Sequence, residues 1–269
     1  MKKVFLIAVL CGASLSAFAQ FEGEIEMRVT SATGNDGAMK MLVGKNAIRT
    51  EMTMSAGQTN VQMTSILNLN KPNVMYLIND KTQSYSEIDV SEMEKMARQM
   101  TPRKATYKVQ KLGKEKILGY DCDHVLVSDE NDEVEMWIAK GLMDYETFKK
   151  FNQSPQADGL QKALREANAL GMPLRQVMNK GTAQETKMEV VKINKTKLPA
   201  STFEIPKGYK KTEGGLMGAG MEMMPEETKA RMREEMKTMS PEQKKKMKEA
   251  LKNLPPEQRK MMEQMLNEK

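Results

Sequence analysis

The sequence has very little cysteine, histidine and aromatic residue. Of its 269 residues, two are cysteine, one is histidine and one is tryptophan, and aromatic residues make up 5%. Cys11 lies in an N-terminal apolar stretch that we expect to be removed, which leaves Cys122 alone. A single cysteine cannot form an intramolecular disulfide, so the folded chain must be stabilised by its apolar core. We expect Cys122 to be a small buried residue, with an intermolecular disulfide or a redox-sensitive thiol as the alternative.

The sequence also lacks the motifs that mark common catalytic and cofactor sites. It contains no Gly-x-Ser-x-Gly frame, no glycine-rich phosphate loop before a helix and no Cys-x-x-Cys pair. Lysine and arginine number 42 against 36 acidic residues, a net charge of +6. This mild excess is spread over the chain without interleaved aromatics, unlike the pattern of nucleic-acid binders. We predict a protein that is not an enzyme, needs no cofactor and binds no nucleic acid.

The first 19 residues show the three parts of a secretory signal peptide. Lys2 and Lys3 give a positive start, Val4–Leu10 is apolar, and a small-x-small motif ends at Ala19. The apolar part is too short to span a bilayer, and no other run approaches about 18 apolar residues. We predict cleavage after Ala19 and a periplasmic chain that starts at Gln20, with at most peripheral membrane contact. Lipid attachment at Cys11 is the alternative, which the large Leu10 before it disfavours.

Alternating apolar and polar residues predict a mainly β (α+β) domain over residues 20–210. Short strands at regular spacing indicate an open antiparallel sheet. The predicted strands are residues 21–29, 39–43, 48–54, 61–69, 74–79, 84–88, 106–112, 123–127, 133–139, 174–178 and 186–194. Two helices are expected, one with Ser91 as its N-cap and running to about Met100, and one from Tyr145 to Leu170 that Gly171-Met172-Pro173 ends.

Methionine is the residue in excess, with 27 copies, and it is dense near the C-terminus. After a predicted Gly/Met-rich linker at 211–224, a Pro-Glu-Glu or Pro-Glu-Gln unit recurs at Pro225, Pro241 and Pro256. We predict a tail of short amphipathic helices at 225–269, with Ser240 as one N-cap. Its methionines, such as Met232, Met236 and Met239, suit an apolar docking face. Thioethers also bind Cu(I), so copper binding by the tail is the alternative.

One cluster of reactive residues stands out, at Asp121-Cys122-Asp123-His124. On a strand, Cys122 and His124 share one face, and together they could supply two ligands to a soft metal. The sequence shows no third and fourth ligand beside them. We therefore predict no metal site, and interpret the cluster as the start of a strand after Gly119 with Cys122 turned inward.

Several segments in this order resemble the exported bacterial proteins grouped as domain of unknown function 4412. The segments are Phe21-Glu22-Gly23, Ile48-Arg49-Thr50-Glu51-Met52, Gly119-Tyr120-Asp121-Cys122, Val134–Ile138 with Trp137, and Phe203–Tyr209. The family is similar to the periplasmic lipoprotein carriers LolA and LolB. This resemblance implies a half-barrel curved around helices, with an apolar cavity and no known catalytic residues. The tail units also resemble periplasmic stress chaperones of the Spy type.

Together these observations predict a non-enzymatic periplasmic binding module for a lipid, another apolar ligand or a lipidated partner protein. The alternative is a copper-binding or envelope-stress protein that acts through its tail. Period two selects sets of residues for the concave face but does not say which set points inward. The candidate ligand-binding residues are Met27, Val29, Met52, Met54, Leu67, Leu69, Met75, Leu77 and Trp137. The sequence leaves the ligand and the oligomeric state open.

Overall fold

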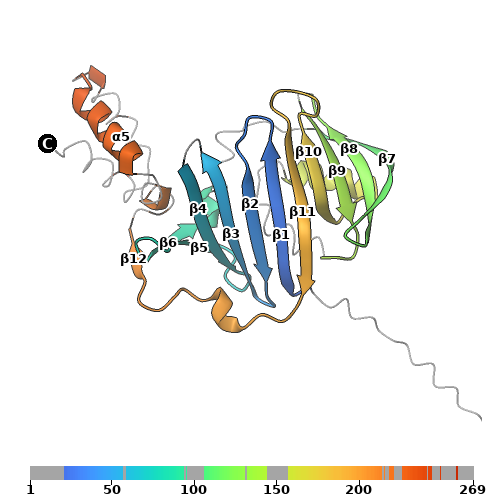
Figure 1. Ribbon diagram of the computed structural model, residues 1–269, viewed down its shortest axis with the longest axis horizontal. Coiled ribbons are helices and arrows are strands. Elements are labelled where there is room, and N and C mark those ends of the chain that lie inside the picture. The colour runs from blue at the N-terminus through green and yellow to red at the C-terminus, as the bar shows by residue number, and fades with distance from the viewer. Residues whose placement is uncertain are drawn as a thin grey trace, which may run out of the picture.

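All eleven predicted strands form, and with one more they make a single curved sheet in the computed structural model (Figure 1). The strands are β1 Gly23–Ser31, β2 Gly37–Val43, β3 Ala47–Ala56, β4 Thr59–Asn68, β5 Val74–Asn79, β6 Ser84–Asp89, β7 Lys108–Ile117, β8 Tyr120–Ser128, β9 Glu133–Ala139, β10 Met172–Met178, β11 Thr186–Lys195 and β12 Lys210–Thr212. The predicted mainly β class with an antiparallel sheet is confirmed.

The structure describes residues 21–56, 59–93, 95, 106–130, 132–143, 157–213, 215, 218–220, 226–240, 242–243, 249 and 259. The predicted signal peptide, with Cys11, lies outside these ranges. So do most of the first predicted helix, the first part of the second and most of the tail repeats.

The sheet order is β12-β6-β5-β4-β3-β2-β1-β11-β10-β9-β8-β7. Each neighbouring pair is antiparallel except β12 and β6, which run parallel. At the other end of the sheet β7 is an edge strand, and Lys108, Lys111, Lys114 and Lys116 on it are exposed. Lysines on an edge strand disfavour pairing with a second chain, because each would have to lose its hydration.

Close packing inside the sheet explains one glycine of the β1 strand. Gly23 has φ +150°, and a Cβ atom there would lie 2.1 Å from the Asn194 carbonyl oxygen on β11. Any other residue would push β11 away or leave this backbone conformation. A second tight position, Gly44, lies against the Phe203 ring of the short helix η1 (Ala200–Phe203).

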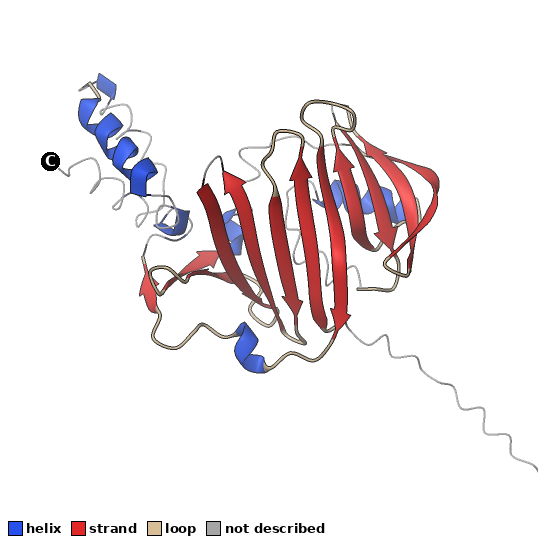
Figure 2. Ribbon diagram, viewed as in Figure 1, coloured by secondary structure: helices blue, strands red, loops and turns tan. Residues whose placement is uncertain are grey.

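Helix α3 (Ala157–Glu166) covers one face of the sheet at β8 and β9 (Figure 2). Its Leu164 packs into a buried cluster with Val125, Met136 and Ile138. The helix ends earlier than predicted. Asn168 adopts φ +50°, and the Ala169 N–H bonds to the Leu164 carbonyl, which closes the last turn. Two of the residues predicted to end it, Met172 and Pro173, instead begin β10.

The helical segment after β6 is also capped differently from the prediction. Helical residues begin at Val90, and the Asp89 carboxylate accepts hydrogen bonds from the Ser91 backbone N–H at 2.8 Å and the Ser91 hydroxyl at 2.6 Å. Asp89 is therefore the N-cap, and Ser91 is the residue whose N–H donates to it. Both are good capping residues two positions apart, so the sequence alone did not decide between them. The Ser91 hydroxyl also lowers the pKa of Asp89 by hydrogen bonding to its ionised form.

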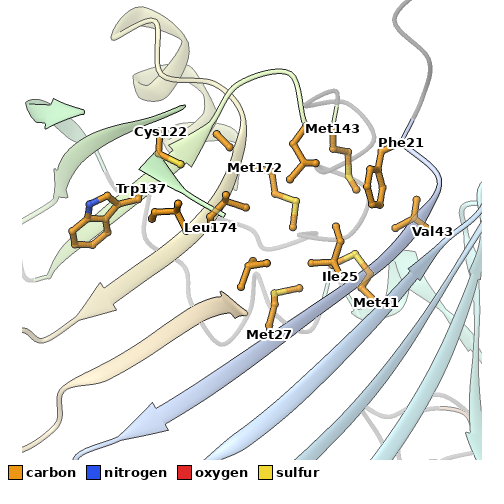
Figure 3. Packing of buried hydrophobic residues seen from close by; sticks show 14 of the residues in the cluster. Phe21, Ile25, Met27, Met41, Val43, Cys122, Trp137, Met143, Met172 and Leu174 are labelled. Carbon is orange, nitrogen blue, oxygen red and sulfur yellow. The ribbon is translucent and has the colours of Figure 1, made fainter. Parts of the chain in front are cut away.

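The largest buried cluster joins β1 to β10 across a gap in the ladder. β10 pairs with β11 only from Arg175 to Met178, so the strands diverge below that point. Met172 and Leu174 fill the resulting space, against Ile25 and Met27 of β1 (Figure 3). Met143, from the segment after β9, and Phe21 extend the same cluster.

After β11 the chain forms η1 and then β12, which lies at the edge of the sheet opposite β7 (Figure 1). Thr212 pairs with Ser86, and their hydroxyl oxygens lie 2.7 Å apart. Lys211 reaches the Glu87 carboxylate at 2.7 Å. Lys211 and Thr212 thus extend the sheet, although both fall within the range predicted as linker.

Of the tail, the structure describes helix α5 (Glu226–Thr238) and a few residues beyond it. α5 begins directly after Pro225, as predicted from the position of that proline. Ser240 then makes a capping box with Gln243: each side chain bonds to the other residue's backbone N–H, at 3.2 and 2.9 Å. In the part of the chain with described coordinates, no helix is long and apolar enough to cross a membrane.

Candidate functional site

Strand register places four methionines side by side on one face of the sheet. Met27 of β1 pairs with Met39 of β2, which pairs with Met52 of β3, which pairs with Met63 of β4. Paired residues on neighbouring strands point to the same face. We call these four residues the methionine row. Met27 is buried and the other three are half-buried.

A second apolar row lies beside the methionine row, toward the end of the strands where the face is more open. Val29 pairs with Met188 on β11 and with Gly37 on β2, and Gly37 pairs with Met54, which pairs with Val61. Met54 is 44% exposed, which is unusual for a methionine of a sheet interior. The two rows therefore form a continuous apolar surface that solvent can reach at this end.

The remaining candidates of β4 and β5 lie on this face at its opposite end. Leu67 pairs with Met75, and Met75 pairs with Ile88 of β6. Leu77 is buried beside Ile88, and Leu69, just past β4, packs against the largest buried cluster. Eight of the nine predicted residues thus belong to one face. We call it the inner face, because α3 and the segment after β6 pack on it.

The pairing places Trp137 on the other face of the sheet. Trp137 pairs with Arg175, which pairs with Glu189, which pairs with Arg28, and Arg28 follows Met27 on β1. Because successive residues point to opposite faces, Trp137 does not extend the methionine row. It nevertheless belongs to the largest buried cluster, which continues past the place where β10 and β11 diverge. Period two within β9 already separates Trp137 from Met136 and Ile138. Which of these two sets shares a face with the methionine row depends on the register from β9 through β10 and β11 to β1.

Trp137 forms the centre of a stacked ladder on the outer face. The His124 ring stacks on it with centroids 4.1 Å apart, and the Arg175 guanidinium lies 5.0 Å from its ring centre. Arg175 also bonds to Glu189 at 2.8 Å and to Glu115 at 2.9 Å. Burial alone would lower the pKa of Arg175, but the two carboxylates outweigh it and raise the pKa. The ladder is thus a structural cation–π and ion-pair array.

Acidic residues beside the ladder are paired with lysines. Glu135 accepts a hydrogen bond from Lys180 at 2.6 Å and lies 3.1 Å from His124 Nε2. The Lys180 bond, opposed by burial and aided by His124, lowers the pKa of Glu135. Burial would raise the pKa of Glu189, but Lys187 and Arg175 outweigh it and lower the pKa. A half-open cavity of about 360 Å³ adjoins this array, between β8–β10 and the loop at Asn179–Thr182.

The Asp121–His124 cluster is part of this structural array. Cys122 is buried, its thiol hydrogen-bonds to the Tyr120 carbonyl, and burial raises the pKa of the thiol. A thiol of raised pKa is a poor nucleophile and metal ligand at neutral pH. Among the described residues, no three His, Cys, Asp or Glu side chains are grouped to hold a metal. The prediction that Cys122 is a small buried residue is confirmed, and it lies on the same side of β8 as His124.

Sequence reasoning missed four apolar side chains of the two rows, namely Met39, Val61, Met63 and Met188. Val61 and Met63 alternate in step with the selected Leu67 on β4, whereas no residue of β2 or β11 was selected. What the sequence does not contain is the register between strands, which brings Met39 and Met63 into one row with Met27 and Met52.

A family model described as Domain of unknown function (DUF4412) matches residues 21–209. The chain belongs to the DUF4412 family. The match confirms the resemblance inferred from the sequence motifs, and it covers the sheet from β1 to the end of the crossing segment before β12. No curated protein matches the sequence of this DUF4412 protein.

Three solved structures illustrate the folds to which this DUF4412 protein is similar. An uncharacterized conserved protein from Thermus thermophilus is 9% identical to this chain, with a TM-score of 0.42. The matched region covers 71% of this chain and 90% of that protein. A chain of the MucA/MucB complex of Pseudomonas aeruginosa is 8% identical, with a TM-score of 0.39, and the match covers 70% of this chain and 57% of that chain. The lipoprotein LppX of Mycobacterium tuberculosis is 10% identical, with a TM-score of 0.34, and the match covers 65% of this chain and 88% of LppX.

The copper hypothesis for the tail concerns residues that are mostly outside the described coordinates. Met232 and Met239 are half-buried at and just after α5, while the side chain of Met236 is not among those described. The tail as a copper site therefore stays a prediction from the sequence.

Proposed function

We propose that this DUF4412 protein is an exported, non-enzymatic binding module that holds a lipid, another apolar ligand or the lipid of a modified partner on its inner face. The observation that carries the proposal is the absence of charge on that face. In the described parts of β1 to β6, no position in the methionine row or in the rows parallel to it bears a charged side chain.

The outer face of the same strands carries ion pairs, beside buried apolar side chains at Leu42, Ile66 and Ile78. Glu24 and Glu26 of β1 form ion pairs with Lys40 of β2 and Lys192 of β11, at 3.5 and 2.9 Å. Arg49 pairs with Glu51 along β3 at 2.8 Å. Charged side chains in β1 to β3 are thus confined to the outer face, and the uncharged inner face favours an acyl chain because no charge there would lose its hydration.

Burial of apolar surface supplies the affinity in this proposal. Each methylene of a ligand moved from water onto the face contributes about 0.8 kcal/mol. Methionine side chains are flexible and polarisable, so the methionine row can adjust to acyl chains of different length and shape. The half-buried Met52 and the exposed Met54 mark the part of the face that a ligand can reach.

A charge placed on the inner face tests the proposal. Met52→Glu puts a carboxylate into the methionine row, and we expect the affinity for the fluorescent apolar probe N-phenyl-1-naphthylamine to fall at least about tenfold, since the charge loses hydration when the probe binds. Thr53→Glu is the matched control, because Thr53 follows Met52 on β3 and points to the outer face. Thermal unfolding of both variants checks that the sheet is retained.

The two variants separate the possible results clearly. Weaker binding by Met52→Glu with unchanged binding by Thr53→Glu supports the inner face as the site. Equal affinity in both variants and the unmodified chain would place the probe elsewhere. Native mass spectrometry of the protein from its own periplasm then identifies the ligand, because a co-purifying lipid and a copper ion differ in mass.

A further inference from the structure

Part of the inner face is covered by a short segment from beyond β12. Residues 218–220 are helical, and Ala219 is 2% exposed. Ala219 packs in one cluster with Leu77 of β5 and Ile88 of β6, with Met63, Met75 and Met93 around it. The range 211–224 was predicted as a flexible linker, yet Ala219 within it is among the most buried residues of the described chain.

Strand β12 delivers this segment to the face. The Lys210 N–H bonds to the Gln83 carbonyl at 3.0 Å, and the Thr212 hydroxyl bonds to the Tyr85 carbonyl at 3.2 Å. Together with the Lys211–Glu87 ion pair, these contacts hold the chain to the β6 edge seven residues before Ala219. The segment therefore remains close to the face even when it is not in contact with it.

The covered residues belong to the surface proposed to bind the ligand. Met63 is the last member of the methionine row, and Met75 and Leu77 are candidate ligand-binding residues. One volume of space cannot hold both Ala219 and an acyl chain. Ala219 contributes a single methyl group to the contact, so a long ligand can replace it with a larger apolar area.

We infer that residues 218–220 are an intramolecular competitor, tethered by β12, that covers the β4–β6 end of the inner face and is displaced when an apolar ligand extends into it. The inference rests on the proposed function. Ligand binding thereby moves the start of the C-terminal segment off the sheet, which couples occupancy of the face to the position of the tail. The apparent affinity of the intact chain for its ligand equals the intrinsic affinity multiplied by the fraction of molecules in which the segment is not docked.

Two aspartate variants of the full chain test this inference. Ala219→Asp places a carboxylate in the Leu77–Ile88 cluster and should release the segment, so N-phenyl-1-naphthylamine should bind at least about fivefold more tightly. Gly220→Asp is the matched control. Gly220 is exposed, and a Cβ atom there would meet nothing within 4 Å, so the same charge should leave the affinity unchanged.

Hydrogen exchange on the unmodified chain gives a second, independent measurement. We expect saturating probe to speed exchange of the backbone amides of residues 218–220. Equal affinities in all three proteins, with exchange that the probe does not change, would overturn the competitor while leaving the binding face intact. Failure of all three proteins to bind the probe would instead overturn the proposed function, and the competitor with it.

Discussion

Methionine at four paired positions of β1 to β4 gives the inner face properties that leucine would not. The thioether chain has three rotatable bonds and no branching, so neighbouring methionines can rearrange around different ligands. The same sulfur atoms make the face sensitive to oxidation, since a sulfoxide is polar. Met54, at 44% exposure, is the residue of this surface most open to an oxidant.

The outer face offers a test at the level of one carboxylate. Glu135 has a lowered pKa because it accepts a hydrogen bond from Lys180, with a smaller contribution from His124. The folded chain therefore stabilises the ionised form of Glu135 more than the unfolded chain does, where the pKa of the group is about 4.3. This contribution to stability is complete above about pH 4.3 and is lost as the pH falls through the lowered, folded-state value.

We predict that Glu135→Gln is less stable than the unmodified protein at neutral pH and that the difference shrinks as the pH falls below about 4.3. Urea unfolding at a series of pH values measures it. Glu133→Gln, at an exposed glutamate two residues earlier on β9, is the control for the change in net charge. A stability difference that stays constant down to about pH 3 would show that the Lys180 bond does not stabilise the fold.

At the level of elements, the helical segment after β6 depends on which residue caps it. The side-chain acceptor is Asp89, the last residue of β6, and Ser91 donates to it with both its N–H and its hydroxyl. The strand and the helix thus share one residue, which fixes the direction in which the chain leaves the sheet toward the inner face.

We predict that Asp89→Ala lowers the free energy of unfolding by about 1 kcal/mol, the typical loss for an N-cap. Ser91→Ala should cost less than half of that, because the Ser91 N–H still bonds to the Asp89 carboxylate. Urea unfolding of the two variants side by side measures the ratio. A larger cost for Ser91→Ala would restore Ser91 as the N-cap, as the sequence pattern had indicated.

At the scale of the whole molecule, the segment between β11 and β12 ties the two halves of the sheet together. This segment includes η1, which lies beside β3, and leads to β12, which pairs with β6. The Tyr209 hydroxyl donates to the Asp80 carboxylate at 2.7 Å, just before β12 begins. Strand β12 in this way covers residues 84–86 of the β6 edge, which would otherwise be open to pairing with another chain.

Two shortened chains test where the sheet domain ends. We expect a chain that stops after Glu213 to unfold cooperatively, because it keeps β12. A chain that stops after Tyr209 should also fold but be less stable by more than about 1 kcal/mol, since Ser86 loses its hydroxyl partner Thr212 and β6 becomes an edge. Thermal and urea unfolding compare them. Loss of cooperative unfolding in both chains would mean that the tail belongs to the core.

Local pattern was enough to predict the class of the fold and most of its elements. Alternation in each segment indicated every strand from β1 to β11, and β5 and β9 begin and end at the predicted residues. This works because side-chain alternation is a property of a single strand next to a core. For the same reason, eight of the nine candidate ligand-binding residues share a face.

Contacts between distant segments decided the rest. The methionine row exists only through the register of four strands. Trp137 lies on the other face because it pairs with Arg175, which is linked through Glu189 to Arg28 of β1. β12 is a three-residue strand whose partner lies 126 positions earlier, so its own sequence carries no signal. Ala219 is buried among residues of β5 and β6 for the same reason. Hydrophobic periodicity acts within one element, whereas register and coverage depend on which elements the folded chain brings together.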